Sequence, residues 1–325
     1  MIRRVASHRF FAAQGTAALM SPVPIPVGLP RSQAAVVTVG NFDGVHLGHA
    51  AMLARVIELA QRLQLPSLVV TFDPPPLAIL APERLPPRLT TVSQKTILLK
   101  SLGISDVIVW PATRELLSLT AEEFFQQIVI DQLQCQGIVE GPNFCFGRGR
   151  AGDVALLRTL GEASQIPVVI AQASESSGRM ISSSEIRAAL HQGNVVLAYE
   201  LLGRPYTLTG TVVAGAQRGR TIGFPTANLA QIETLIPPHG VYAGRTTVHG
   251  RIWPVALNIG PNPTFGEHST KIEAYLIGYT GDLYGQVLTV ELLQYMRGVR
   301  KFAGIDQLKA QLQSDIAAAA AIAHG

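Results

Sequence analysis

Two patterns of hydrophobic positions divide the chain. From residue 34 to about residue 202, short β-branched runs bounded by Gly, Pro or Asp alternate with longer segments of helical period. The short runs predict strands at residues 35–39, 68–72, 107–110, 138–140 and 168–171. Helices are expected between them, including residues 47–63 and 120–133. Apolar strands separated by helices are typical of a parallel sheet covered on both faces, in which ligands bind beyond the carboxyl ends of the strands.

The pattern changes after residue 203. The expected strands now follow one another without helices between them, at residues 206–214, 241–248, 252–259, 271–277 and 286–293. Regularly spaced strands with Gly and Pro turns predict a closed antiparallel barrel. A helix at about residues 305–322 ends the chain. We therefore predict a doubly wound α/β domain over residues 34–202 and a β-barrel domain with a terminal helix over residues 203–325.

Residues 1–33 stand apart from both predicted domains, because they contain four arginines and no acidic residue. An arginine-rich, acid-poor N-terminus is one feature of a transit peptide. Four prolines between residues 22 and 30 interrupt any amphipathic helix there. This favours the simpler interpretation, a poorly ordered leader upstream of an alternative start at Met20.

Composition excludes several classes of protein. Of the 325 residues, 47% are hydrophobic and 15% are charged, which excludes disorder as the main state. The sequence has no run of about 18 apolar residues, so we expect no transmembrane helix. Cys135 and Cys145 form no CxxC motif or disulfide framework, which suits a reducing compartment, and we expect a cytoplasmic protein. Only five of the 26 basic residues are lysines, and arginine's planar fork binds phosphate oxygens well, so composition allows a phosphate-handling protein.

The segment at residues 40–49 joins a predicted strand to a predicted helix through a turn that contains glycine. Backbone N–H groups and the positive end of the helix dipole favour an anion there, and Gly44 and Gly48 allow a nucleotide to approach the backbone. His46 and His49 are three residues apart, so both can face a triphosphate and donate hydrogen bonds to the charge that builds as pyrophosphate leaves. Two ordinary surface histidines are the alternative. A zinc site is not favoured, because no third ligand is apparent nearby.

A second phosphate-binding candidate lies at residues 181–187. Three serines precede a predicted helix that carries Arg187 in its first turn. An ordinary N-cap explains one serine, but not three serines together with an arginine. The nearby Gly147-x-Gly149-x-x-Gly152 matches a dinucleotide fingerprint only formally, because it reads as a polar loop late in the domain.

The barrel carries the third candidate. Its loop contains Gly215, Gly219 and Gly223 with Arg218 and Arg220, which can cradle phosphates. A glycine-rich hairpin without a ligand is the alternative, and no Walker-type P-loop occurs in the sequence.

Two elements beside this loop suggest phosphoryl transfer. Thr226 and Asn228 alternate, so both side chains point one way on an extended segment, and their oxygens suit Mg²⁺ bound jointly with phosphates. Glu273 is an isolated acid in an apolar strand, pointing opposite to Ile272. A carboxylate within reach of a hydroxyl can take its proton during phosphoryl transfer, whereas a solvated carboxylate is the common alternative.

These motifs, taken together, resemble the bacterial bifunctional riboflavin kinase/FAD synthetase family. Residues 40–49 read Gly-Asn-Phe-Asp-Gly-Val-His-Leu-Gly-His, and residues 181–187 read Ile-Ser-Ser-Ser-Glu-Ile-Arg. Further matching segments follow in the family's order at residues 71–76, 141–147, 210–228, 282–285 and 297–302, so the resemblance runs from about residue 36 to 315.

The resemblance implies two reactions. The barrel, as a riboflavin kinase domain over residues 203–325, would phosphorylate riboflavin to FMN with ATP and release ADP. The domain at residues 34–202, as an FMN adenylyltransferase (nucleotidyltransferase) domain, would join FMN to the adenylyl group of ATP, giving FAD and pyrophosphate. No nucleic acid or membrane is expected as a partner.

The resemblance also assigns site residues. Glu273 matches the family's catalytic base, and Thr226 and Asn228 match residues that bind ATP with Mg²⁺. We take His46, His49, Arg187 and Glu273 as catalytic candidates. The residues expected to bind nucleotide, flavin or phosphate are Gly40, Asn41, Phe42, Asp43, Gly44, Asn143, Ser183, Ser184, Gly215, Gly219, Arg220, Gly223, Pro225, Thr226, Asn228 and Arg297.

Departures from the family pattern leave two alternatives. Pro75, Tyr275, Gly278 and Val299 stand where the family usually has other residues, and the last three suggest an FMN adenylyltransferase with a decayed kinase domain. A nucleic-acid-binding barrel is suggested by the pI of about 9.2. Against it, aromatic residues make up only 6% of the chain and acidic residues are interspersed with the arginines.

Overall fold

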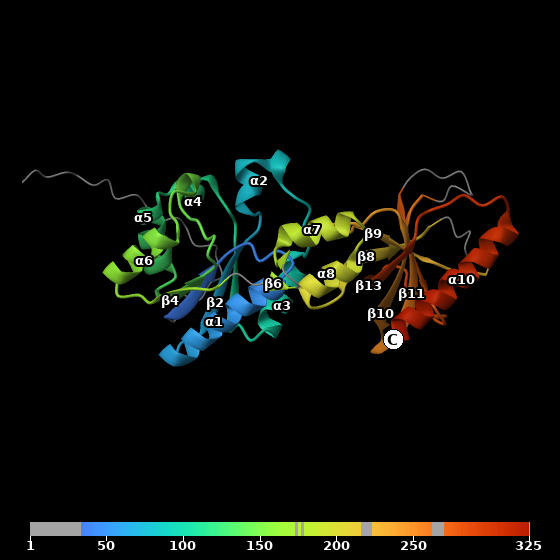
Figure 1. Cartoon of the computed structure of the whole chain (residues 1–325), viewed down its shortest axis with the longest axis horizontal. Helices are drawn as coiled ribbons and strands as arrows, with labels where there is room; N and C mark the ends of the chain where they lie inside the picture. Colours follow the sequence, from blue (N-terminus) through green and yellow to red (C-terminus); the bar gives the residue numbers. More distant parts are fainter. Residues whose placement is uncertain (1–33, 173–174, 177–178, 216–222, 262–269, 325) are drawn as a thin grey trace, which may run out of the picture.

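The computed structural model describes residues 34–172, 175–176, 179–215, 223–261 and 270–324. Figure 1 shows a parallel sheet with its helices at one end, a barrel at the other end, and the helices α7 and α8 between them. The predicted leader at residues 1–33 lies outside the described residues.

The first part is a five-stranded parallel sheet with the strand order β3-β2-β1-β4-β5. The strands are β1 (Ala35–Val39), β2 (Ser67–Phe72), β3 (Asp106–Trp110), β4 (Cys135–Glu140) and β5 (Val168–Ile170). The order changes direction between β1 and β4, which is the position where open α/β sheets bind ligands.

Helices cover both faces of this sheet. The helices of this part are α1 (Leu47–Leu63), α2 (Pro76–Leu80), α3 (Val92–Ser101), α4 (Arg114–Ser118), α5 (Ala121–Glu123) and α6 (Val154–Ala163), with single 3-10 turns η1 (Pro82–Arg84) and η3 (Arg148–Arg150). Val36 packs with Leu53 and Leu99 on one face, whereas Val37 packs with Ile128 and Leu157 on the other. The strands are therefore buried on both faces, as their continuous apolar sequence predicts.

The helix expected at residues 120–133 has a different geometry. Thr120 and Glu123 form a reciprocal cap, but only α5 is α-helical, and η2 (Phe124–Gln132) is a π-helix. The wider turn places two adjacent pairs of apolar residues, 124–125 and 128–129, in the core. The backbone N–H of Leu133 accordingly bonds the carbonyl five residues earlier.

The second part is a closed antiparallel barrel with the strand order β10-β11-β12-β9-β8-β13. The strands are β8 (Tyr206–Val213), β9 (Ala227–Ala230), β10 (Gly240–Val248), β11 (Arg251–Gly260), β12 (Lys271–Leu276) and β13 (Val287–Arg297). The terminal helix α10 (Ile305–His324) packs against β10 and β11. The predicted fold class is confirmed, although the short strand β9 was not expected as a separate strand.

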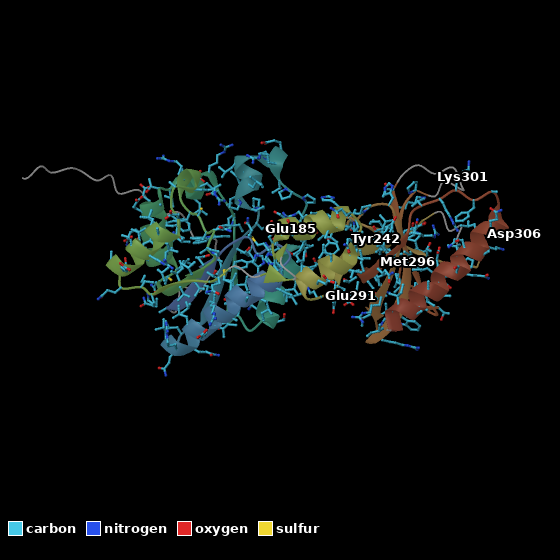
Figure 2. All side chains as sticks on the ribbon, viewed as in Figure 1. Glu185, Tyr242, Glu291, Met296, Lys301 and Asp306 are labelled. Atoms are coloured by element: carbon cyan, nitrogen blue, oxygen red, sulfur yellow. The ribbon has the colours of Figure 1, made fainter. Side chains whose placement is uncertain are left out.

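The connection between the two parts consists of a hairpin, β6 (Glu175–Ser176) and β7 (Arg179–Met180), and the helices α7 (Ser183–His191) and α8 (Val195–Leu202). Leu190 of α7 and Leu201 of α8 belong to the same buried cluster as Leu208 and Tyr242 of the barrel, the latter labelled in Figure 2. A domain boundary after residue 202 stays a prediction, and an apolar core crosses it.

Glu140 is a buried acid at the carboxyl end of β4. The β1–β4 ladder ends at Val37 and Ile138, and beyond it the Glu140 carboxyl accepts the N–H of Val39 at 2.7 Å. Glu140 is only 2% exposed, and burial raises its pKa well above the ordinary value of 4.5.

Glu140→Gln should change how stability depends on pH. Because its pKa is raised, native Glu140 keeps a proton that the unfolded chain loses above about pH 4.5, so its contribution to stability falls as pH rises toward the native pKa. Glutamine keeps the acceptor for Val39 but does not titrate. The difference in the free energy of unfolding, wild type minus Glu140→Gln, should therefore decrease as pH rises. Urea unfolding of both proteins over a pH series measures this difference. A difference that does not vary with pH would contradict this assignment.

Candidate functional site

The loop between β1 and α1 has an unusual backbone. Phe42, Gly44 and Val45 all have positive φ angles, of 46°, 82° and 40° respectively. Such a conformation is costly for a β-branched residue such as Val45 and persists only where the surroundings enforce it. Phe42 and Val45 are both buried, which fixes the loop against the core. A Cβ on Gly40 would meet the ring of Phe42 at 3.1 Å.

The two histidines of this loop are stacked. Their ring centroids lie 3.6 Å apart with an interplanar angle of 15°. His46 is the N-cap of α1, and its Nδ1 accepts the backbone N–H of His49 at 3.2 Å. A neutral His46 therefore carries its proton on Nε2. A side chain at Gly48 would meet the His46 ring at 3.1 Å and the Ile181 carbonyl at 3.2 Å, so glycine allows the later loop to approach.

Both imidazoles are neutral at physiological pH. Burial lowers the pKa of His46 from 6.5 to about 4, although Asp43 opposes the shift, and Arg204 adds to it. Burial, and then the neighbouring His46 and Lys95, lower the pKa of His49 well below 6.5. Neutral imidazoles can still donate one hydrogen bond each to a developing negative charge.

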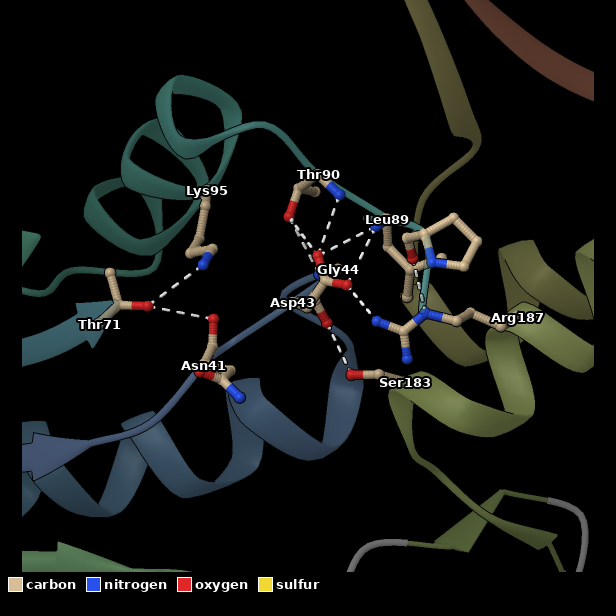
Figure 3. Close-up of polar contacts among 10 residues, drawn as sticks. Asn41, Asp43, Gly44, Thr71, Leu89, Thr90, Lys95, Ser183 and Arg187 are labelled. Carbon is tan, nitrogen blue, oxygen red and sulfur yellow. Dashed lines mark hydrogen bonds and ion pairs between the residues drawn. The ribbon is translucent and has the colours of Figure 1, made fainter. Parts of the chain in front are cut away.

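Asp43 connects this loop to two distant segments (Figure 3). Its carboxylate accepts the backbone N–H groups of Leu89 and Thr90 at 3.0 and 3.1 Å and forms an ion pair with Arg187. Its backbone carbonyl accepts the Ser183 hydroxyl at 2.8 Å. The structure thereby brings the start of α7 to the histidine loop, as one nucleotide-binding site requires.

One expectation for α7 needs correction. Arg187 is the fifth residue of α7 and so lies beyond its first turn. Its guanidinium is held by Asp43 and by the Pro87 carbonyl, 2.8 Å from Nε, and the expected phosphate contact stays a prediction. The N-cap is Ser182, whose hydroxyl accepts the N–H of Glu185, while Ser184 is exposed.

A cavity of about 190 Å³ lies beside this cluster. It is lined by Asn41, Asp43, Ser183 and Arg187, and also by Lys95. Lys95 was missed by the sequence reasoning, although it has the i,i+4 spacing to Leu99 that marks the buried face of α3.

Arg204 is also absent from the predicted site residues, because it lies beside the predicted domain boundary. Its guanidinium donates to the carbonyls of Gly44 at 2.5 Å and Val45 at 2.9 Å. A residue at the start of the barrel part therefore holds the backbone of the histidine loop.

The loop after β4 lies at the same edge of the sheet. Asn143 is exposed there and is absent from the described lining of the 190 Å³ cavity. The segment at 147–152 contains the 3-10 turn η3 and precedes α6, with Arg148 and Arg150 exposed. The structure does not bring these arginines to the histidines.

A second candidate site lies on the barrel. Glu273 of β12 is directly opposite Asn228 of β9 in the antiparallel register, so both side chains lie on one face. Glu273 alternates with the buried Ile272 and Ala274, as its sequence pattern predicts. Thr226 lies two residues before Asn228 and shares this direction on an extended segment.

Glycine is needed beside these residues. A Cβ on Gly215 would lie 2.3 Å from the Asn228 side chain. Gly215, Pro225, Thr226 and Asn228 all line a cavity of about 410 Å³. Gly223 has a φ of 94°, and none of the described residues comes within 4 Å of its Cβ position. The expected contributions of Gly219 and Arg220 lie outside the described residues.

Two of the residues that depart from the family pattern have structural roles. Gly278, with a φ of 81°, adopts a backbone conformation that favours glycine after β12. Tyr275 packs edge-on against Phe224, with ring centroids 6.0 Å apart. With both residues in place, Asn228 still pairs with Glu273 across β9 and β12.

The structure shows the protein partners of Arg297, and its expected part in ligand binding stays a prediction. Its Nε and Nη2 donate to the Asp315 carboxylate at 3.0 and 2.5 Å, and Nη1 donates to the Gly298 carbonyl at 3.0 Å. Asp315 is 4% exposed. The structure therefore places Arg297 in an ion pair that fastens α10 to the barrel.

Arg297→Met should destabilise the protein by about 3 kcal/mol, since removing one partner of a buried ion pair leaves an uncompensated charge. Urea unfolding measures the loss. Arg55→Met is the matched control, because the exposed Arg55–Glu58 pair is expected to contribute less than about 1 kcal/mol. Equal effects of the two substitutions would show that Arg297 does not fasten α10.

Two protein families match successive parts of the chain. The FAD synthetase family matches residues 29–185, and the riboflavin kinase family matches residues 202–323. A bifunctional riboflavin kinase/FMN adenylyltransferase of Pseudomonas fluorescens is 38% identical over 295 residues, covering 90% of this chain and 94% of the relative. Its counterpart in Escherichia coli K12 is 37% identical, covering 86% of this chain and 90% of the relative.

A solved structure has the same fold. The crystal structure described as a macrolide-efflux protein from Streptococcus pneumoniae aligns with a TM-score of 0.79 and 31% identity, covering 87% of this chain and 93% of that one. Within the part of the present chain that the structure describes, no helix is long and apolar enough to cross a membrane.

Proposed function

The chain belongs to the family of bifunctional riboflavin kinases and FMN adenylyltransferases, and we propose that its two reactions take place at the two sites described above. The histidine loop and α7 form the adenylyltransferase site, and the β9–β12 face forms the kinase site. Because both parts of the family match along the chain, an enzyme with adenylyltransferase activity alone is not favoured.

In the adenylyltransferase site, the FMN phosphate attacks the α-phosphorus of ATP. The new P–O bond forms as the bond to the bridging oxygen of the β-phosphate breaks, and pyrophosphate leaves with that electron pair. No proton transfer is needed, so the neutral imidazoles of His46 and His49 act as hydrogen-bond donors to the accumulating charge. Asp43, Ser183 and Arg187 hold the two loops together around the nucleotide.

In the kinase site, Glu273 takes the proton of the riboflavin primary hydroxyl as its oxygen bonds the γ-phosphorus and ADP leaves. The register that pairs Glu273 with Asn228 carries this proposal, because it sets the base beside the nucleotide-binding segment.

Thr226 and Asn228 fit a magnesium ion, because they offer a hydroxyl and an amide oxygen on one face, with a carboxylate opposite. When bound with ATP, Mg²⁺ neutralises phosphate charge.

The proposal is tested by incubating the protein with riboflavin, ATP and Mg²⁺ and separating the flavins by chromatography. FMN should form first and FAD after it. FAD formed only from supplied FMN would instead support the decayed kinase. We also propose a cytoplasmic location, which the free thiols of Cys135 and Cys145 support.

A further inference from the structure

Lys95 is a buried cation that forms no ion pair with any of the residues that the structure describes. It lies on α3, is 7% exposed, and its Nζ donates to the Thr71 hydroxyl at 3.2 Å. Among the residues that the structure describes, no carboxylate forms an ion pair with this ammonium. A lysine ammonium has three donors, so the described protein leaves most of its hydrogen-bonding capacity unused.

The two carboxylates whose charges act on Lys95 already form ion pairs with arginines. Asp43 forms an ion pair with Arg187, and Asp73 forms one with Arg88 at 2.8 Å. Together with these two ion pairs, Lys95 leaves one positive charge uncompensated. Burial lowers its pKa, while Asp43 and Asp73 oppose the shift and Arg88 adds to it. A buried charge without a partner is costly, so such a residue suggests a bound anion.

The surplus charge faces the proposed adenylyltransferase site. Lys95 lines the same 190 Å³ cavity as Asn41, Ser183 and Arg187. Figure 3 shows its ammonium above Thr71, whose hydroxyl in turn donates to the Asn41 carbonyl at 3.1 Å. Its charge also reaches His49, whose pKa it helps to lower.

We propose that Lys95 is a further catalytic residue of adenylyl transfer, whose ammonium binds a phosphate oxygen of the substrates in this cavity. The inference rests on the proposed adenylyltransferase site. A phosphate supplies the missing negative charge, and the ammonium in turn stabilises charge on the phosphates during transfer. Two substrates carry this chemistry, ATP and FMN.

Lys95→Met tests the proposal in the full-length protein, because methionine fills much of the same volume without charge. FMN-to-FAD conversion should fall about 10²–10³-fold, as for other preorganised donors. Riboflavin-to-FMN conversion should stay near wild type. The melting temperature should be equal to or above that of the wild type, because a buried unpaired charge is removed.

Lys100→Met is the matched control. Lys100 lies on the same helix but is half exposed and pairs with Asp106 at 3.0 Å. It should leave both reactions unchanged.

Two further measurements separate the sources of the phosphate. A raised KM for FMN in Lys95→Met, with the KM for ATP unchanged, assigns the contact to the flavin phosphate. Sodium pyrophosphate should raise the melting temperature of the wild type. If Lys95→Met loses this increase, the phosphate contact of Lys95 is assigned to the nucleotide phosphates. Lys95→Arg keeps a charge and should recover part of the activity.

The proposal is overturned if Lys95→Met makes FAD within about threefold of wild type. It is also overturned if Lys95→Met loses stability together with both activities and Lys95→Arg recovers none, because the role is then structural. A wild-type protein that forms no FAD would instead contradict the proposed function itself, so the two failures are distinguishable.

Discussion

Glu273→Gln should abolish FMN formation from riboflavin while conversion of supplied FMN to FAD continues near the wild-type rate. The amide keeps the shape of the side chain but cannot accept the hydroxyl proton, and a general base typically contributes about 10²–10⁴-fold. Chromatographic assays of the two reactions, each started separately, measure the effect.

Glu291→Gln is the control for this experiment. Glu291 lies on β13 of the same barrel, is labelled in Figure 2, and pairs with Arg245 at 2.6 Å. We expect it to retain both activities. Equal loss of both reactions in Glu273→Gln would point to a folding defect or a wrong assignment, and a melting curve tells these apart.

His46→Ala and His49→Ala should give the opposite pattern, in which FMN accumulates and FAD is missing. Loss of one preorganised donor costs about 10²–10³-fold in rate. His191→Ala is the control, because His191 is an exposed residue at the end of α7. Full FAD formation in both active-site variants would remove these histidines from the mechanism.

The pH dependence tests the protonation state of the same histidines. Because the pKa of His46 is about 4, its ring is already neutral at pH 6, and raising the pH to 7.5 removes no proton from it. The rate of FAD formation should therefore not fall across this range. A fall of tenfold or more would indicate that a charged imidazole is the donor.

Local sequence was sufficient for most of the fold. The bounds of β1 and α1 agree with the prediction, because β-branched runs and a helix start after glycine are local signals. The strand β9 has only four residues and follows a proline, so its pairing with β8 and β12 depends on the closed barrel. The π-helical geometry of η2 was likewise not indicated by the local sequence pattern.

The site was predicted less completely, since its contacts join distant parts of the chain. Asp43 and Arg187 are 144 positions apart, and no spacing rule connects them. The motif indicated Arg187 but not that a carboxylate already binds it. Arg297 was expected to bind a ligand because it matches the family motif, and its contact with Asp315, 18 residues away on another element, could not be read from the sequence. Lys95 belongs to none of the motifs singled out in the sequence, and its burial beside the cavity is visible only in the structure.

The position of α7 and α8 affects how such enzymes can recombine. A hybrid protein joined at residue 203 would separate Leu190 and Leu201 from the barrel residues with which they share a core. A hybrid joined at residue 182 would keep that core. Asp43 would then come from one parent, whereas Ser183 and Arg187, which contact it, would come from the other. Neither junction leaves both interfaces intact. The two halves should therefore be inherited as a pair, and a functional exchange between relatives requires matching residues on both sides of these helices.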